Sequence, residues 1–549
     1  MAQLSDDAVV PGFVDYKKRP VIRSKQGGWG SAGFIIGVEM GERLTYFGVS
    51  ANLIQFLTLK LGQSTAVAAA NVNAWTGTSF LLPIFGALIA DSLLGKYLTI
   101  IFASLIYVLG LVMLTLSATL PSLNCTNHGT NAAGKPKCSL HAQTIIFFIA
   151  LYMVALGQGG HKPCVQAFGA DQFDEEHPEE RKAKSSFFNW WYLGVSMGSV
   201  IGTFVLSYTQ DNISWGVGFG IPGVLMVIAL LVFVGGTVRY RFQTKSEGPS
   251  PFKRIGKVFV TAARNWRTPH PVHPGDEEED SQKTQRLRFL DKALIGCSKS
   301  EVEEAKAVLR LIPIWLTSLV FAILIAQPPT LFTKQGATLE RSITSKVKLP
   351  PATLNGIVGI FIVLFIPIYD RIIVPFARRS TGKPSGITML QRVGVGLFIS
   401  TVALAVSALV EIKRRNTASL HGLTNSPKAT LPMSIWWLIP QCALLGVADA
   451  FTMVGLQEFF YDQVPDELRS VGASMYLSIM GVGSLISGAL VSIIDKETGK
   501  GGKHSWLSTN LNQGHLDYFY WLLTGLSAAA LLLFIFAAKS YVYNKKSRA

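Results

Sequence analysis

The chain is organised around the stretch Gly37-Val38-Glu39-Met40-Gly41-Glu42-Arg43-Leu44-Thr45-Tyr46. This stretch lies within an apolar segment, residues 32–59, that is long enough to cross a lipid bilayer. Charged side chains in the hydrocarbon core cost free energy, so they mark a functional site by default. The stretch therefore predicts a membrane-spanning helix that carries a buried charged cluster.

The spacing of the charges predicts one shared helix face. Glu39 and Glu42 are three residues apart, and Glu39 precedes Arg43 by four, which is the favourable orientation for an ion pair. One guanidinium neutralises one carboxylate, which leaves the second free to bind and release a proton. The alternative is an ion pair that merely ties two helices together.

The composition agrees with an integral membrane protein. The 549 residues are 49% hydrophobic and 15% charged, whereas an ordinary soluble protein carries about 25% charged residues. The formal net charge of +16 could suggest nucleic acid, but the basic residues lie mostly between apolar segments. That placement fits the positive-inside rule, so we expect a lipid bilayer and no nucleic acid as partner. The polar first thirty residues do not resemble a cleavable signal peptide.

The apolar pattern predicts an all-α membrane protein with twelve transmembrane helices in two six-helix bundles. The expected spans are 31–59, 72–91, 98–120, 143–168, 186–208, 214–237, 306–327, 352–371, 387–410, 433–457, 470–494 and 517–540. The corresponding parts are a cytosolic N-terminal tail (1–30), an N-terminal bundle (31–237), a cytosolic linker (238–304), a C-terminal bundle (305–540) and a cytosolic tail (541–549).

Two glycosylation sequons support this orientation. Asn124 and Asn212 begin Asn-X-Ser/Thr triplets in loops that an even number of spans places outside. Cys125 and Cys138 share the first of these loops, where they could form a disulfide or remain free. No metal-ligand spacing is present in the sequence.

The linker contains an amphipathic helix pattern. Phe252, Ile255, Phe259 and Ala262 recur at helical spacing among basic residues, which is typical of a helix lying on the anionic inner leaflet. A solvated basic face without lipid contact is the alternative. An acidic run at 276–280 follows as a spacer.

Two cytosolic turns echo each other in the two halves. Asp91 and Lys96 follow the second span, and Asp370 and Arg371 close the eighth. The first pair resembles the loop signature of the major facilitator superfamily, and repeated halves are typical of transporters. We expect these four residues to latch the two bundles on the cytosolic side.

The fourth span contains a second costly charge, Lys162, beside His161. At 1.5 Å rise per residue, Glu39 and Lys162 lie at similar depths, about 12 to 13 Å from the cytosolic boundary, so the cluster and the lysine could meet. His161 is interpreted as a packed or interfacial residue in preference to a proton carrier. Glu458, in the tenth span, is expected to pair with Lys162 across the halves or to be solvated at its helix end.

These residues resemble the proton-dependent oligopeptide transporter family. Glu39-Met40-Gly41-Glu42-Arg43 is similar to its E-x-x-E-R motif, and three further stretches are similar to its plant nitrate transporter/peptide transporter (NRT1/PTR) branch: Gly169–Asp174, Phe187–Tyr192 and Arg288–Ala293. The resemblance implies proton-driven symport by alternating access. It assigns proton coupling to Glu39, Glu42 and Arg43, and substrate binding or gating to Lys162, Glu458 and Tyr46.

The resemblance leaves the substrate open among nitrate, peptides, hormones and other plant metabolites. Relatives that carry nitrate can use a His in the seventh span, where this chain has Ile325. We therefore expect nitrate to be a poor substrate or to bind elsewhere. Protons are the expected coupling ion, and no cofactor is expected. We expect a monomer, with a dimer left open, in the plasma or the vacuolar membrane.

Two other classes of function are weighed against transport. An enzyme would need a nucleophile with a base or a metal site, and the sequence suggests neither. A transporter-like sensor with little flux is the stronger alternative. Thr99 matches a position phosphorylated in a sensing relative, although it could be an ordinary helix-start threonine.

Overall fold

The computed structural model describes residues 9–120, 140–174, 176–243, 251–267, 285–343, 348–381, 387–427, 429–465, 468–502, 504–541 and 543. Asn124, Cys125, Cys138 and the acidic run 276–280 lie outside these residues. The side chains of Asp91 and Asp370 are not described either.

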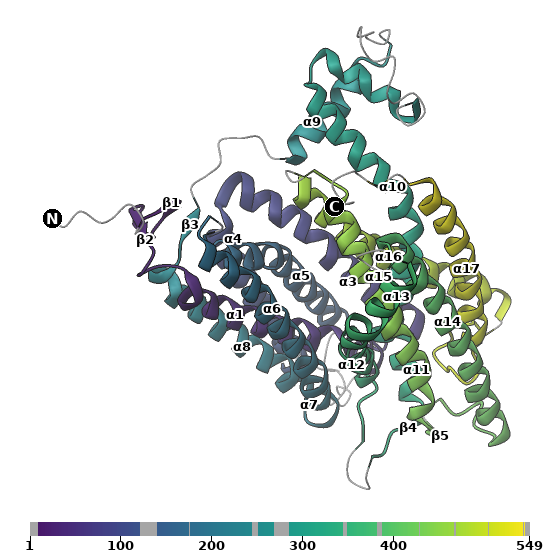
Figure 1. The fold of residues 1–549 in the computed structure, drawn as a ribbon. Helices are drawn as coiled ribbons and strands as arrows, with labels where there is room; N and C mark the ends of the chain where they lie inside the picture. The colour runs from purple at the N-terminus through teal and green to yellow at the C-terminus, as the bar shows by residue number, and fades with distance from the viewer. Residues whose placement is uncertain are drawn as a thin grey trace.

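Twelve long helical segments make up the described chain (Figure 1). The N-terminal half consists of α1 (Gly28–Ser50) with α2 (Leu53–Leu59), α3 (Thr65–Ile89), α4 (Lys96–Thr119), α5 (Leu140–Ala170), α6 (Pro178–Ile201) with α7 (Ser207–Asn212), and α8 (Trp215–Gly235). The C-terminal half consists of α10 (Lys299–Ile325) with α11 (Thr333–Ala337), α12 (Thr353–Ile368) with α13 (Val374–Thr381), α14 (Met389–Leu420), α15 (Ile439–Asp462), α16 (Arg469–Thr498) and α17 (Leu516–Ser540).

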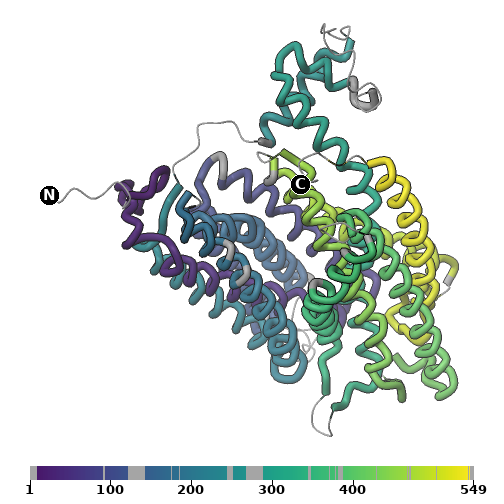
Figure 2. Tube along the Cα trace, in the orientation of Figure 1, coloured from purple at the N-terminus to yellow at the C-terminus, as the bar shows by residue number. Residues whose placement is uncertain are grey.

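Eleven of these segments are long and apolar enough to cross a membrane by length and composition. The remaining segment, α1, carries Glu39, Glu42 and Arg43 and packs between α6 and α8. The two halves lie side by side in Figure 2, the first in purple to blue and the second in green to yellow. The expected helical membrane fold in two six-helix halves is confirmed.

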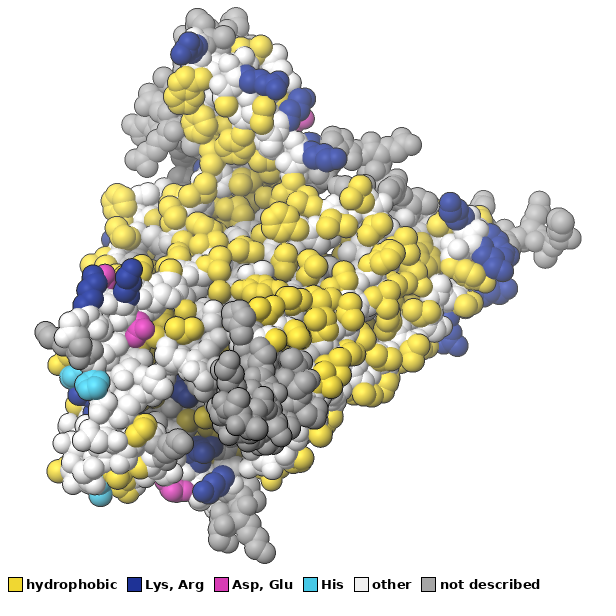
Figure 3. All heavy atoms as spheres, turned by 180° about the vertical axis from the view of Figure 1, so that it is seen from behind, with side chains coloured by type: hydrophobic (Ala, Val, Ile, Leu, Met, Phe, Trp, Pro, Cys, Tyr) yellow, Lys and Arg dark blue, Asp and Glu magenta, His cyan; other side chains and the backbone are white. Residues whose placement is uncertain are grey.

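The outer surface of the helices is apolar. Figure 3 shows a broad face of hydrophobic side chains, with Lys and Arg gathered toward its margins. Large hydrophobic side chains such as Leu231, Leu532 and Phe536 are exposed. A surface of this kind is stable only when it faces hydrocarbon, because water would penalise so large a patch.

The N-terminal tail is folded, which the sequence did not predict. Strand β1 (Val9–Val14) pairs antiparallel with β2 (Pro20–Ile22) and with β3 (Phe242–Gln243), which follows α8. Glu180 accepts two hydrogen bonds from the buried Arg241 guanidinium and lies 3.0 Å from Arg23 Nη1. The tail, the start of α6 and the end of the half are thereby tied together. A second pair of strands, β4 (Leu339–Glu340) and β5 (Leu431–Ser434), joins loops of the C-terminal half.

The linker helix α9 (Pro251–Arg264) forms as predicted, and protein covers part of its apolar face. Ile255, Val258 and Ala262 are buried, and the last two pack against Leu290, Ala293, Val302 and Ala305. Contact of the basic face of α9 with the inner leaflet stays a prediction. Figure 1 shows α9 standing beyond the bundles beside the start of α10. The helices of the linker cover their own hydrophobic surface because neighbouring segments supply a matching one.

The halves are joined by hydrogen bonds toward the end opposite the termini. Lys334 Nζ, on α11, lies 3.0 Å from Thr58 Oγ1 and 3.4 Å from Gln55 Oε1, both on α2. Asn73 donates to Ser487 at 3.1 Å. These contacts, which we call the outer closure, connect α2 and α3 to α11 and α16.

One residue of the predicted cytosolic latch, Lys96, contacts its own half of the protein and not the other half. Lys96 Nζ lies 2.6 Å from Asp171 Oδ2, and Lys96 also donates to Gln243, so its partners belong to its own half. The lysine begins α4 and Asp171 follows α5, two helices that pack tightly along their length. Lys96 therefore stabilises the N-terminal half and does not latch it to the other. Arg371 is exposed.

Candidate functional site

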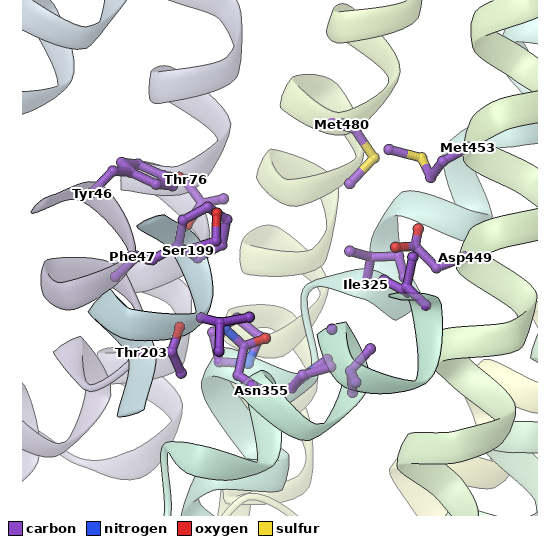
Figure 4. A pocket seen from close by; sticks show the side chains of 18 of the residues that line it. Tyr46, Phe47, Thr76, Ser199, Thr203, Ile325, Asn355, Asp449, Met453 and Met480 are labelled. Carbon is purple, nitrogen blue, oxygen red and sulfur yellow. The ribbon is translucent and has the colours of Figure 1, made fainter. Parts of the chain in front are cut away.

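A cavity of about 380 Å³ lies between the two halves. Its walls come from α1, α3 and α6 on one side and from α10, α12, α15 and α16 on the other. In Figure 4, Tyr46, Thr76 and Ser199 face Asp449, Met453 and Ile325 across this space. The lining is mostly apolar, with hydroxyl, amide and carboxyl groups at separate points. This composition is typical of a pocket for a small organic molecule.

The charged cluster of α1 lies buried beside this cavity. Glu39 Oε1 is 3.1 Å from Arg43 Nε, and Glu42 Oε2 is 2.5 Å from Arg43 Nη2. The three residues are 2%, 0% and 5% exposed. The spacing predicts the Glu39–Arg43 pair and one free carboxylate, whereas in the structure Arg43 contacts both carboxylates. The site can therefore gain a proton without leaving an arginine unpaired, because the second carboxylate remains as its partner.

Close helix packing holds the cluster in place. A Cβ atom on Gly157 would lie 2.7 Å from the Cβ of Tyr107, so glycine lets α5 approach α4. Gly198 likewise meets the backbone of α1 at Met40. Small residues at these crossings bring the helices close enough for side chains from α1, α4 and α5 to meet.

Lys162 of α5 joins the cluster, as the matching depths predicted. Its ammonium interacts electrostatically with Glu42 and Glu39, and it lies 4.3 Å from the centroid of the Phe80 ring. Arg43 similarly lies 5.7 Å from the centroid of the Tyr46 ring.

Two aromatic rings separate the cluster from the cavity. Tyr46 and Phe80 line the cavity, whereas Arg43 and Lys162 are not among the described residues that do. Tyr46 also stacks on Trp75, with ring centroids 5.5 Å apart. In this conformation the cations are therefore one layer behind the cavity wall, and Tyr46 is the predicted site residue that faces the cavity.

Glu458 does not pair with Lys162 in this structure. Its carboxylate is 46% exposed and lies 3.9 Å from Arg392 Nη1, at the end of the C-terminal half that the sequence predicts to be cytosolic. Glu458 is also not among the residues that line the cavity. The position near the end of α15 explains the difference, because a helix end leaves the carboxylate partly solvated.

Asp449, two turns earlier on α15, is a site residue that sequence analysis missed. It lines the cavity, and its Oδ1 atom is buried without a hydrogen-bond partner. Tyr192 and Tyr476 interact with it electrostatically. A lone acidic residue within an apolar span, in Gly446-Val447-Ala448-Asp449-Ala450, was the signal that could have revealed it.

Two predicted modification sites can be placed. The Thr99 hydroxyl donates to the Gly95 carbonyl at 2.8 Å, and the residue is 5% exposed, as expected for an ordinary helix-start threonine. Its phosphorylation stays a prediction and requires another conformation. Asn212 is exposed at the end of α7, and its glycosylation also stays a prediction.

Comparison with known proteins identifies the family. The model of the POT family matches residues 97–507. The chain belongs to the POT family. Among plant relatives of this family, Protein NRT1/PTR FAMILY 5.10 of Arabidopsis thaliana is 57% identical over 540 residues, covering 97% of this chain and 96% of the relative. NRT1/PTR FAMILY 5.12 of the same plant is 52% identical over 539 residues, covering 97% of this chain and 96% of the relative. The predicted NRT1/PTR resemblance is thus confirmed.

Solved POT structures share the fold. An auto-inhibited POT family peptide transporter superposes with a TM-score of 0.73 at 22% identity, covering 94% of this chain and 98% of that one. A POT family transporter in complex with 5-aminolevulinic acid has a TM-score of 0.64 at 14% identity, covering 92% and 95%. The protein therefore has the transporter fold of the major facilitator superfamily, and it is a multi-pass membrane transporter by family.

Proposed function

We propose that this POT family member is a proton-coupled symporter that moves a small organic solute across the plasma or vacuolar membrane by alternating access. The observation that carries the proposal is the pair of buried carboxylates, Glu39 and Glu42, sharing Arg43 directly behind the wall of the central cavity. Two carboxylates share one guanidinium, so one carboxylate can bind a proton and lose its charge, and it regains the charge when the proton leaves.

Proton binding would bias which side of the cavity is open. When Glu42 binds a proton, its attraction for Arg43 and Lys162 weakens, and the side chains that these cations contact, Tyr46 and Phe80, lose their fixed positions. Loss of the proton restores the attraction. A ligand shifts a conformational equilibrium by its differential affinity for the two states, and here the proton is such a ligand.

The conformation supports a cytosol-facing state. The outer closure joins the halves at the end opposite the termini, and the sequence predicts that end to be extracellular or lumenal. Asn73, a member of the outer closure, also lines the cavity, so the closure borders it. Release of the solute to the cytosol is the step that such a state would perform.

The cavity favours an organic solute over nitrate. Ile325 lines it at the position where nitrate-carrying relatives can use a His, and Met453 and Met480 add further apolar surface. Asp449 presents an unpartnered carboxyl oxygen, which accepts hydrogen bonds from cationic or donor groups. We infer a solute with an apolar body and a hydrogen-bond donor or cationic group.

The driving force is adequate for such a cycle. One proton per cycle contributes about 2.3 kcal/mol per 100 mV and about 1.4 kcal/mol per pH unit. The sum, about 3.7 kcal/mol, supports several-hundred-fold accumulation of a neutral solute.

The test is transport by purified protein in liposomes with a panel of nitrate, dialanine and plant hormones. In Glu42→Gln and Glu39→Gln, acid-driven uptake should fall at least tenfold, while exchange of labelled for unlabelled solute persists because exchange moves no net proton. Glu497→Gln, an exposed residue paired with Lys500, is the matched control.

Two results would contradict the proposal. Full acid-driven accumulation in both Gln variants and in the double variant would remove the cluster from coupling. Binding of a panel member without measurable flux in any condition would favour the alternative of a transporter-like sensor.

A further inference from the structure

His161 has no role in the proposed cycle, yet it is fully buried beside the coupling cluster. Neither of its ring nitrogens has a hydrogen-bond partner among the described residues. Burying a polar side chain without partners costs free energy, whereas an apolar side chain of similar size would cost none. An apolar side chain would therefore fill this space at a lower free-energy cost than the imidazole.

The geometry connects the imidazole to both acids. One ring nitrogen of His161 and one carboxylate oxygen from each of Glu39 and Glu42 lie within 4.8 Å of one another. The ring nitrogens make no direct hydrogen bond to a described residue, and separations up to this limit can be bridged by one water molecule. Water-mediated transfer of a proton needs no more than this.

The charges around His161 favour a proton over a metal ion. The titratable groups of this region are Glu39, Glu42 and Arg43 on α1, Tyr107 on α4, and Lys162 on the same helix as the histidine. Helix α3 meets this part of α5 at Gly86 and Leu82, which do not titrate. Two carboxylates already face two cations, so a divalent ion would add two unbalanced positive charges in a membrane interior, whereas one proton adds one.

We propose that His161 is a proton-binding member of the coupling cluster and exchanges a proton with the Glu39–Glu42 pair. In the exchange, a carboxylic O–H bond breaks, an imidazole N–H bond forms, and the carboxylate that results returns to Arg43. A neutral imidazole suits both states of the acid, because it accepts from a carboxylic acid with one nitrogen and donates to a carboxylate with the other. Its use in transport rests on the proposed function, but the exchange itself is an equilibrium property of the protein.

The experiment uses the proton as its ligand and needs no solute. Infrared difference spectra of the full-length protein in lipid vesicles are recorded between about pH 3 and pH 8, a range wide enough for a buried imidazole beside a guanidinium. Signals of protonated carboxyl groups and of imidazolium are followed separately. The variants are His161→Gln, His161→Asn and Glu42→Gln, with His421→Gln as control because His421 is exposed on the far end of α14.

When two proton-binding sites interact, a change at one site shifts the pH at which the other binds its proton, and the effect is reciprocal. We expect both substitutions of His161 to move the carboxyl transition by about one pH unit, and Glu42→Gln to move the imidazolium transition by a similar amount. His421→Gln should remove imidazolium signal without moving the carboxyl transition. The Glu42→Gln arm keeps His161 in place, so it tests the coupling even if neither replacement of the histidine folds.

An unmoved carboxyl transition in folded His161→Gln and His161→Asn, or an unmoved imidazolium transition in Glu42→Gln, overturns the proposal and makes His161 a packing residue. These readouts are independent of flux. Coupled transitions in a protein without proton-driven uptake would overturn the proposed symport while leaving the proton exchange intact.

Discussion

Tyr46 and Phe80 each contact a cation of the cluster and also line the cavity. A cation over an aromatic ring is attracted by the negative face of the ring, by about 0.5 to 2 kcal/mol depending on desolvation. A change of charge in the cluster therefore alters the preferred position of a ring that lines the cavity. Proton binding and solute binding can be coupled at this scale without a direct contact between Arg43 and the solute.

Asp449 should determine affinity for the solute. Asp449→Asn removes the charge but keeps the size, and a hydrogen bond to a charged group contributes about 1.5 to 3 kcal/mol. We expect the Michaelis constant for a solute with a donor or cationic group to rise about tenfold or more. Uptake kinetics in liposomes measure it, with exposed Asp462→Asn on the same helix as control. Equal constants in the two variants would remove Asp449 from the binding site.

Lys162 should be coupled energetically to Glu39 and not to Glu458. Lys162 interacts with Glu39 in the buried cluster, whereas Glu458 lies beside Arg392 at the end of α15. Residues without shared partners have additive effects, within about 0.5 kcal/mol. Double-mutant cycles on transport rates with Lys162→Ala, Glu39→Gln and Glu458→Ala should give additivity for Lys162 with Glu458. A coupling above about 1 kcal/mol in that cycle would show that the two meet in another state of the transporter.

At the scale of elements, α11 is the part of the C-terminal half that reaches α2 of the other half. On its other side, Gln335 donates to Glu411, which is paired with Arg414 in a fully buried site. Breaking a buried pair of this kind costs about 3 to 5 kcal/mol, while the Lys334 contacts are to neutral side chains. When the outer side opens, α11 should therefore remain with its own half and separate from α2.

Lys334→Met should favour the outward-open state. The substitution keeps the apolar stem and removes hydrogen bonds of a charged donor, which contribute about 1.5 to 3 kcal/mol. The outward-open population should rise about tenfold or more. Spin labels at Val67 and Ser342, near the outer ends of the two halves, report it as a longer distance by pulsed electron resonance. An unchanged distance distribution, equal to that of exposed Lys348→Met, would contradict the role of the outer closure.

At the scale of the whole molecule, the even number of spans places both termini and the linker on one side of the membrane. The β-sheet of the tail and helix α9 lie beyond the same ends of the bundles in Figure 1, as this topology requires. Basic side chains of the tail and the linker should then face the cytosol.

This orientation can be tested in intact cells. An epitope inserted in the linker should bind antibody only after the membrane is permeabilised, because an antibody cannot cross the bilayer. An epitope next to Asn212 should bind without permeabilisation. Binding in the reverse order would invert the topology.

The sequence predicts most of the fold because apolar length alone defines a span. The sequence also predicts the cluster, because Glu39, Glu42 and Arg43 share one helix face within an apolar segment that crosses the membrane. Glu458 was assigned by resemblance, and the structure places the cavity carboxylate at Asp449 instead, since position along α15 and not charge decides which acid faces the cavity. The partners of Lys96 and the covered face of α9 depend on segments distant in the sequence, which no local pattern contains.

The small sheet of the tail has a consequence for how the protein is made. Strand β1 is synthesised first, but its partner β3 follows the sixth span. The edge of β1 that pairs with β3 therefore has no partner until the first six helices have been synthesised. Once residues 242 and 243 emerge, the strand can close the N-terminal half into a ring before any helix of the second half exists. The chain order thus allows the two ends of the first half to be joined during translation, before the second half is assembled.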